Sequence, residues 1–177
     1  MCIRDSINCI GLPKTIDNDL PVTDNCPGFG SVAKYIAIST HEASLDVASM
    51  ASSSTKVFLL EVMGRHAGWL AASAGIIKKG NNTPPHIILL PEVTFNLKKF
   101  LSEVKKTVSN NGYCVIVASE GIRDNKNNFI AASDTKDSFG HAHLGGVAPK
   151  LSKIITNKLN YKVCLLYTSD AADELRS

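Results

Sequence analysis

Short apolar runs alternate along this chain with longer segments whose apolar residues recur every three to four positions. Four runs are uniformly apolar and rich in residues that favour strands; they lie at residues 7–12, 56–63, 86–91 and 113–119. Four segments have the helical spacing; they lie at residues 30–51, 66–77, 96–108 and 144–159. Strands and helices therefore alternate through the chain. Because strands of this kind are covered on both faces, we expect an α/β fold: a doubly wound, mainly parallel sheet with helices on both faces.

Each predicted strand is followed by a polar or charged group. These groups are residues 14–19, residues 64–66, Glu92 and Glu120. In open α/β sheets, ligands bind beyond the carboxyl ends of the strands. A helix cap or a turn explains any one of these groups, but four of them at one edge of a sheet predict a functional site there.

Two carboxylates, Asp17 and Asp19, lie two positions apart in the first of these groups, beside Lys14 and Thr15. This combination suits phosphoryl transfer. One carboxylate can take a proton from a hydroxyl, the second can help to hold a metal, and the lysine offsets phosphate charge. The residues alone leave a second interpretation open, since Asp-Asn-Asp is also common in turns and caps.

Composition narrows the classes of partner. The 177 residues include 19 basic and 16 acidic side chains. This excess favours anionic ligands but includes no basic run dense enough for nucleic acid. No apolar run reaches the roughly 20 residues that cross a bilayer. Cys9, Cys26 and Cys114 are too widely spaced to indicate a zinc site or a disulfide framework. We therefore expect a cytoplasmic protein that binds neither nucleic acid nor membrane.

The two ends of the chain differ in character from its middle. Residues 1–6 and 163–177 resemble non-native, adapter-derived sequence, although a frayed amino end and an acidic tail would also explain them. These ends hold two basic and four acidic residues, so residues 7–162 have 17 basic and 12 acidic side chains, a net charge of +5. We expect this middle part to form a single α/β catalytic unit.

The stretch from Pro13 to Asp19, Pro-Lys-Thr-Ile-Asp-Asn-Asp, resembles the active-site signature of the phosphofructokinases, in particular their pyrophosphate-dependent branch. Residues 63–65, Met-Gly-Arg, resemble the sugar-binding segment of the same family, and the resemblance extends over essentially all of residues 7–162. It implies Mg²⁺-dependent, reversible transfer of a phosphoryl group from pyrophosphate to the 1-hydroxyl of fructose 6-phosphate, in glycolysis and gluconeogenesis. It also implies a homo-oligomer when the protein has its full length.

The resemblance assigns catalytic roles to three residues. Asp17 matches the base that takes the proton from the sugar 1-hydroxyl. Asp19 supports the site electrostatically and has a bearing on the metal, Mg²⁺, for which no ligand is assigned within this chain. Lys14 stabilises the transferring phosphoryl group, as an ammonium placed on developing negative charge should.

The resemblance also implies a set of substrate contacts. Thr15 contacts the sugar phosphate, and Arg65 supplies a fork of donors beside a glycine that permits close backbone approach. Glu120 hydrogen-bonds to sugar hydroxyls. The full set of predicted substrate-binding residues is Thr15, Ile16, Asp17, Lys56, Met63, Gly64, Arg65 and Glu120.

Two further residues are expected to have less direct roles. Lys56 stands where many relatives have an arginine that reaches across a subunit interface to the sugar phosphate. A lysine keeps the charge but loses the bidentate geometry. Glu92 is expected to be structural or to lie at an interface, although some ATP-dependent relatives use this glutamate in an effector site.

Two alternatives are open at this point. The first is an ATP-dependent phosphofructokinase, because some ATP-using relatives have the same Pro-Lys-Thr-Ile-Asp-Asn-Asp stretch. The second is a non-catalytic subunit that binds sugar phosphate, although such subunits usually lose the catalytic carboxylates. The family's glycine-rich donor loop has no counterpart in this chain. We therefore regard the chain as an internal fragment and expect it to be inactive alone.

Overall fold

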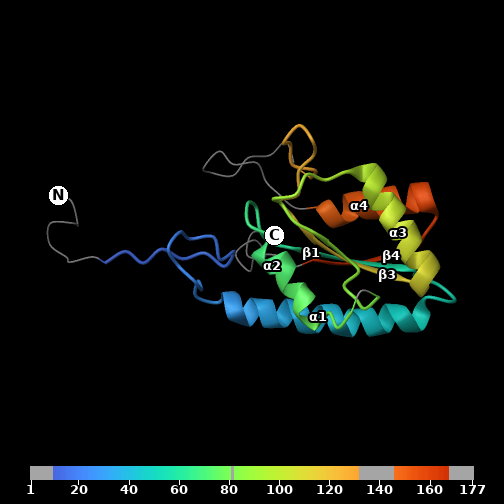
Figure 1. Ribbon diagram of the computed structural model, residues 1–177, viewed down its shortest axis with the longest axis horizontal. Coiled ribbons are helices and arrows are strands. Elements are labelled where there is room, and N and C mark those ends of the chain that lie inside the picture. Colours follow the sequence, from blue (N-terminus) through green and yellow to red (C-terminus); the bar gives the residue numbers. More distant parts are fainter. Residues whose placement is uncertain (1–9, 81, 132–145, 168–177) are drawn as a thin grey trace, which may run out of the picture.

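The computed structural model describes residues 10–80, 82–131 and 146–167 (Figure 1). Helices and strands alternate along it as the apolar pattern predicts. In chain order the elements are α1 (Phe29–Met50), β1 (Val57–Val62), α2 (Trp69–Ser73), the 3-10 helix η2 (Ala74–Ile77), β2 (Ile87–Leu89), α3 (Leu97–Asn111), β3 (Cys114–Ser119), α4 (Val147–Leu159) and β4 (Val163–Tyr167).

The strands form one four-stranded sheet in the order β2-β3-β1-β4. All three strand pairs are parallel, and β1 aligns with β3 from Val57 opposite Cys114 to Val62 opposite Ser119. Helices α1 and α2 cover one face of the sheet, and α3 and α4 cover the other (Figure 1). The predicted α/β fold, with a parallel sheet between two layers of helices, is confirmed.

Strand β1 contributes alternate residues to two separate cores. Val57 and Leu59 are buried against α3 and α4, whereas Phe58 and Leu60 are buried against α1 and α2. Strand β3 alternates in the same way, and all six of its residues are buried. Burial on both faces explains why these strands are apolar at every position.

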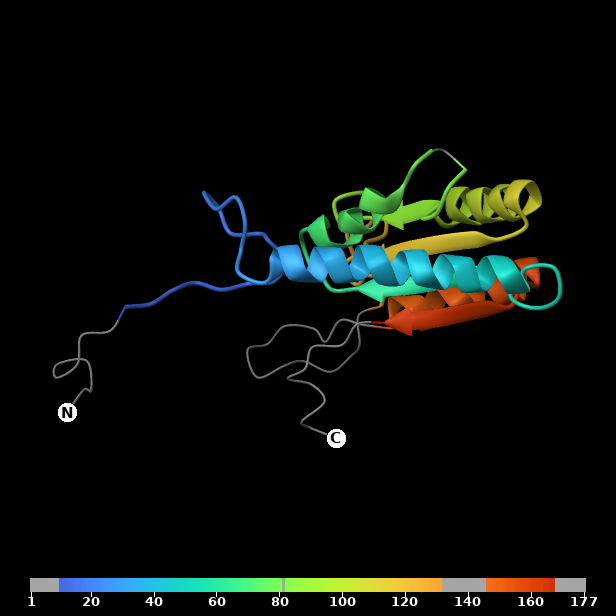
Figure 2. The ribbon, with the colours of Figure 1, turned by 90° about the horizontal axis from the view of Figure 1, so that it is seen from below.

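The first predicted strand is the main difference from the expected elements. Of residues 7–12, the first three lie outside the described residues, and residues 10–12 form no strand. Ile10 is 90% exposed and Leu12 is 86% exposed, on an arm that extends away from the body (Figure 2). The physical reason is that a strand needs a neighbour for its backbone groups, and residues 10–12, the described part of this run, pair with neither edge of the sheet.

Residues 163–167, which the sequence sets apart from the middle of the chain, form β4. This strand pairs with β1 from Val57 opposite Val163 to Glu61 opposite Tyr167. The sheet therefore extends beyond residue 162. The non-native origin of residues 1–6 and 163–177 stays a prediction.

Two helices end where local signals place them. Asn96 caps the start of α3 by accepting a hydrogen bond at its side-chain oxygen from the Lys99 amide, at 3.0 Å, and Gly112 follows its last residue with φ of 84°. Helix α4 ends at Asn160, also left-handed, with φ of 55°. Within the described ranges, none of the helices combines the length and the apolar character that a membrane span requires.

Candidate active site

The carboxyl ends of β1 and β3 lie side by side at one edge of the sheet, and the predicted substrate-binding groups follow them. Met63, Gly64 and Arg65 follow β1, and Glu120 follows β3. The backbone amide of Glu120 donates to the carbonyl of Val62 at 2.9 Å, which extends the pairing of the two strands into their loops. The groups that follow β1 and β3 therefore meet at one rim, as expected, whereas residues 14–19 follow no described strand.

The two loops are in direct contact at Gly64. The hydroxyl of Ser119 donates to the Gly64 carbonyl, and the Gly64 amide donates to Oε1 of Glu120 at 3.4 Å. Gly64 has φ of 130°, and a side chain there would come within 2.5 Å of the Ala67 carbonyl oxygen. A side chain at Gly121 would meet the Arg65 carbonyl oxygen. Both glycines therefore allow a close approach that fixes Glu120 beside Arg65.

Asp17 lies in a loop that its neighbours fold. The Asp17 amide donates to Oγ1 of Thr15 at 3.2 Å. Asn18, with φ of 58°, accepts from the Cys26 amide at 2.7 Å and donates to the Asp24 carbonyl at 3.3 Å. Ile16 packs against the core under α1 and α2. Thr15 and Asn18 thus make the hydrogen bonds that shape this turn. The carboxylates of Asp17 and Asp19 are not needed for it.

Asp17 is in an environment that disfavours its negative charge. Burial raises the pKa of its carboxyl group above the ordinary value, Asp19 raises it further, and the charges of Arg65 and Lys14 oppose the rise. Its Oδ1 atom is buried and has no hydrogen-bond partner among the described residues. A carboxylate in such a setting binds a proton more readily than an exposed one.

Glu120 shares this environment. Burial is the largest cause that raises the pKa of its carboxyl group, the Gly64 amide lowers it, Asp17 raises it and Arg65 lowers it. The electrostatic coupling of Asp17, Arg65 and Glu120 shows that three loops distant in sequence converge on one site. Raised pKa values with a cationic neighbour are characteristic of functional sites.

A hollow of about 620 Å³ opens beside this site. Its wall includes Asp19 and Asn18 from the first loop, Phe29 at the start of α1, and Ala67 and Trp69 after β1. Trp69 is 56% exposed there. The hollow leaves space for a ligand next to Asp19.

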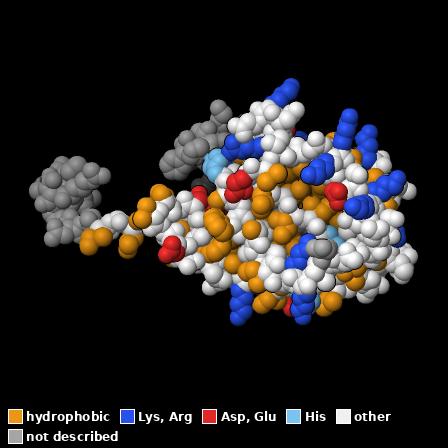
Figure 3. Space-filling model, in the orientation of Figure 1, with side chains coloured by type: hydrophobic (Ala, Val, Ile, Leu, Met, Phe, Trp, Pro, Cys, Tyr) orange, Lys and Arg blue, Asp and Glu red, His pale blue; other side chains and the backbone are white. Residues whose placement is uncertain are grey.

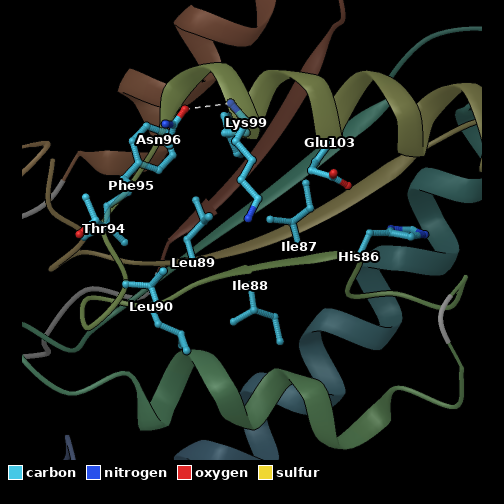
Figure 4. A pocket seen from close by; sticks show the side chains of 13 residues that line it. His86, Ile87, Ile88, Leu89, Leu90, Thr94, Phe95, Asn96, Lys99 and Glu103 are labelled. Carbon is cyan, nitrogen blue, oxygen red and sulfur yellow. Dashed lines mark hydrogen bonds between the residues drawn. The ribbon is translucent and has the colours of Figure 1, made fainter. Parts of the chain in front are cut away.

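A second cavity, of about 360 Å³, lies between β2 and α3 (Figure 4). Residues of β2 such as Ile87 and Leu89 line it, and the Lys99 side chain reaches across it from α3. None of the predicted site residues lines it.

Lys56 is not brought to the rim. It precedes the first residue of β1, and its Nζ donates to the Ala51 carbonyl at 3.1 Å. With about 3.3 Å per strand residue, roughly 20 Å separates it from Val62, the last residue of β1. Lys56 can therefore contact the substrate only at the site of another subunit, which is the role that the resemblance implies and which stays a prediction.

Glu92 has a structural contact. Its Oε1 accepts the Gly68 amide at 2.7 Å, and a side chain at Gly68 would collide with this carboxylate. The contact ties the end of β2 to the loop that follows β1. This supports the structural role expected for Glu92.

Two residues near the rim, Arg123 and Phe129, escape prediction from the sequence, as does their contact with His66. Arg123 Nη2 lies 2.7 Å from Nδ1 of His66, and the Arg123 guanidinium carbon lies 4.3 Å from the centroid of the Phe129 ring. No local pattern reveals this contact, because His66 and Arg123 are 57 positions apart. The only signals are that His66 follows Arg65 and that Arg123 follows Glu120 by three residues.

The described residues lack a cluster of side chains that could bind a metal ion. Among those residues, no group of three or more His, Cys, Asp or Glu side chains could hold a metal ion. Asp17 and Asp19 approach each other closely enough to interact electrostatically, but they do not form a complete ligand set.

Comparisons with known proteins extend over nearly the whole chain. The family model described as phosphofructokinase matches residues 2–167. A protein of Xanthomonas campestris named pyrophosphate–fructose 6-phosphate 1-phosphotransferase is 59% identical over 158 residues, which cover 89% of this chain and 38% of the relative. A protein of Halomonas elongata with the same name is 56% identical over 156 residues, covering 88% of this chain and 37% of the relative.

A solved structure agrees with these relatives. The pyrophosphate-dependent phosphofructokinase of Marinobacter aquaeolei superposes with a TM-score of 0.77 at 50% identity, and the match covers 96% of this chain and 38% of that one. The chain thus spans less than two fifths of the length of the proteins that it matches.

Proposed function

Because this chain belongs to the phosphofructokinase family, we propose that it provides the sugar-phosphate side of an active site that transfers a phosphoryl group from pyrophosphate to fructose 6-phosphate. The observation that carries the proposal is the setting of Asp17. Its carboxyl group has a buried oxygen without a partner and a raised pKa, and it lies in the field of Arg65 and Glu120. A general base for a sugar hydroxyl needs this combination of proton affinity and free hydrogen-bonding capacity.

In the proposed reaction, Asp17 takes the proton of the 1-hydroxyl while the hydroxyl oxygen forms a bond to one phosphorus of pyrophosphate. The bond from that phosphorus to the bridging oxygen breaks, and phosphate leaves with the electron pair. The products are fructose 1,6-bisphosphate and phosphate, with the proton on Asp17. Lys14 and Arg65 stabilise the negative charge that spreads over the phosphoryl oxygens. In reverse, Asp17 returns the proton to the sugar oxygen.

The acceptor sugar is held by the loops that follow β1 and β3. Glu120 accepts hydrogen bonds from sugar hydroxyls, and Met63 and Gly64 let the sugar approach the backbone. Thr15 and Ile16 complete the contact from the first loop. Lys56 would act on the sugar phosphate of a neighbouring subunit, so a homo-oligomer in the cytoplasm is part of the proposal.

Mg²⁺ is the proposed cofactor, and its chemistry would be to neutralise charge on the donor phosphates. The described residues do not by themselves form a magnesium site, because no group of three suitable ligands is present among them. Asp19 is the exposed carboxylate nearest to the base in sequence and is the one that could contribute an oxygen ligand. The remaining ligands would come from the donor or from parts of the longer protein.

Pyrophosphate is preferred over ATP as the donor in this proposal. The support is the name shared by the relatives that are 53% to 59% identical, together with Lys14 next to Thr15. ATP-dependent transfer is the alternative. A non-catalytic sugar-phosphate-binding subunit is less consistent with the chain, because Asp17, Asp19, Arg65 and Glu120 are all present.

The test is to join this chain to the flanking parts of the Xanthomonas campestris relative and to measure fructose 1,6-bisphosphate with each donor. We expect product with pyrophosphate, and a loss of kcat by roughly two to four orders of magnitude in Asp17→Ala with little change in sugar binding. Asp46→Ala, which removes an exposed carboxylate on α1, is the matched control. A clear preference for ATP would overturn the donor, and full activity of Asp17→Ala would overturn the base.

A further inference from the structure

We propose that Arg123 is a positioning residue, which holds the His66 ring and thereby the backbone of Arg65 in the site. The effect of Arg123 on catalysis rests on the proposed function. The contact between the Arg123 and His66 side chains rests on the structure alone. The two parts can be tested separately.

The chemistry of the contact fixes the roles of its atoms. A guanidinium group has five N–H donors and no acceptor. The 2.7 Å contact between Arg123 Nη2 and His66 Nδ1 therefore requires Nδ1 to accept, which leaves the ring proton on Nε2. Arg123 selects one tautomer of His66 and one orientation of its ring.

Arg123 is itself fixed by its own turn. Its guanidinium group lies over the Phe129 ring, at 4.3 Å, and Nη1 donates to Oδ1 of Asn127 at 3.0 Å. The backbones of Arg123 and Phe129 form an antiparallel bridge. Asp124 closes the turn by accepting the amides of Lys126 and Asn128 at 2.8 and 2.9 Å. A cation held by a ring and a side-chain amide loses little further freedom when it binds His66.

The contact joins the two loops that support the site. At their base, Ser119 and Glu120 bind Gly64. At their outer end, Arg123 binds His66. Arg65 lies between these two attachments, and its carbonyl oxygen lies directly against Gly121. Fixing the residue on each side of Arg65 restricts the backbone that presents its guanidinium group to the substrate.

The first experiment needs no turnover. Nitrogen NMR of the histidine rings in the 177-residue chain distinguishes protonated from unprotonated ring nitrogens, and loss of one signal in His66→Asn assigns His66. We expect Nδ1 of His66 to be unprotonated, and Arg123→Ala to shift the ring towards a mixture of tautomers. Lys126→Ala removes a cation from the same turn and should leave the ring unchanged. A mixture in the unmodified chain would overturn the contact.

The second experiment measures the consequence in the joined, full-length protein. Arg123→Ala should raise the KM for fructose 6-phosphate by roughly tenfold or more, with a smaller change in kcat, because Arg65 is less well positioned. The Arg123→Ala/His66→Ala double variant should be no worse than either single variant, since both remove one contact. His66→Asn, whose Oδ1 takes the place of Nδ1 as acceptor, should retain most of the affinity.

The outcomes separate the possible failures. Additive losses in the double variant would mean that Arg123 acts on the substrate itself, and an unchanged KM would mean that the contact is only structural; either result overturns the proposal. If Arg123→Ala does not fold, Arg123→Lys, which keeps the charge but loses the fork, gives the same comparison. Absence of turnover in the unmodified joined protein would contradict the proposed function, whereas the NMR result would stand.

Discussion

The Asp17 carboxyl group shows how function and stability oppose each other at a single residue. Its folded-state pKa is raised above the ordinary value of 3.8 by burial and by Asp19. The contribution of such a group to stability is fully present below 3.8 and is lost as the pH rises through the folded pKa. In its ionised form the carboxylate therefore destabilises the fold, and its proposed role as a base would be the reason to retain it.

Asp17→Asn should consequently stabilise the chain at neutral pH while abolishing turnover in the joined protein. The substitution keeps the shape of the side chain and removes the charge. Urea unfolding at neutral pH should give a higher midpoint for the variant, and the difference should shrink as the pH falls through the raised pKa of Asp17 and be absent below 3.8. A lower midpoint at neutral pH would show that the carboxylate has partners that offset its burial.

His86 gives a pH dependence of the opposite sign. Its Nδ1 accepts the Val115 amide at 3.0 Å, which requires a neutral ring, and burial lowers its pKa below the ordinary value of 6.5. Stability from this group is present above 6.5 and is lost as the pH falls through the folded pKa.

We therefore expect the urea midpoint to fall between neutral pH and mildly acidic pH, and His86→Asn to reduce that fall. Asparagine keeps an acceptor for the Val115 amide and does not titrate. His41→Asn, at an exposed position on α1, is the control and should leave the slope unchanged. Equal slopes in the unmodified chain and His86→Asn would contradict the prediction.

At the scale of elements, Glu61 anchors α4 to the sheet. This carboxylate belongs to the penultimate residue of β1 and is only 5% exposed. Its two oxygens accept the amides of Val147 and Ala148, the first residues of α4, at 3.2 and 2.8 Å. An anion at the start of a helix satisfies amides that have no partner within the helix and interacts favourably with its dipole.

Glu61→Ala should destabilise the chain by about 2 kcal/mol or more, because two buried amides lose their acceptors. Glu61→Gln keeps one acceptor oxygen and should lose less. Hydrogen exchange of the α4 amides and urea unfolding measure the effect. Glu42→Ala, at an exposed position on α1, should change neither. A loss from Glu61→Ala as small as that from Glu42→Ala would mean that α4 is held by its apolar face alone.

The elements themselves were largely predictable, because their signals are local. Asn96 and Gly112 mark the ends of α3, and uniform apolarity marks β1 and β3 as strands with two covered faces. The run at residues 7–12 has similar apolarity but no strand to pair with in its described part, so composition alone misleads there. The strand at residues 163–167 was missed because the segment was judged by its resemblance to foreign sequence rather than by its apolar pattern.

In the site, too, residues with a local signal were predictable, whereas contacts between distant segments were not. Arg65 and Glu120 were placed together because the residues after parallel strands share one edge. Asp17 follows no described strand and was singled out by its spacing from Asp19 beside Lys14 and by the resemblance. Glu61 was missed because a charged residue inside an apolar strand gives no sign of the helix that it binds 86 positions later. The pair of His66 and Arg123 was missed for the same reason, since only the folded chain brings them together.

At the scale of the whole molecule, apolar side chains are exposed on the amino-terminal arm and on α1. Val22 is fully exposed, and Tyr35 and Leu45 on α1 are each 60% exposed. Figure 3 shows apolar atoms along the arm and across the adjoining face. Together with Ile10 and Leu12, these residues give the chain a surface that other protein would normally cover.

We expect the purified chain to self-associate as its concentration rises, which sedimentation at low and high concentration would measure. Ile10→Ser/Leu12→Ser should weaken the association without lowering the unfolding midpoint, because these side chains lie outside both cores. In the joined protein the surface would be covered and the variants should have a smaller effect. A chain that stays monomeric at every concentration would contradict the prediction.

The chain alone should also be inactive. Phosphoryl transfer requires a positioned donor and its metal in addition to a base and a held acceptor. The described residues gather Asp17, Arg65 and Glu120 on the proposed acceptor side but provide no metal-binding group of three ligands, and the chain covers only 38% of its Xanthomonas relative.

We therefore expect weak binding of fructose 6-phosphate, reduced in Glu120→Gln, and no fructose 1,6-bisphosphate with either donor. Calorimetric titration and a product assay test the two halves of this expectation independently. Robust turnover by the 177-residue chain would mean that the donor binds within these 177 residues. In that case the cavity between β2 and α3, where Lys99 is the available cation, would be the first place to look for it.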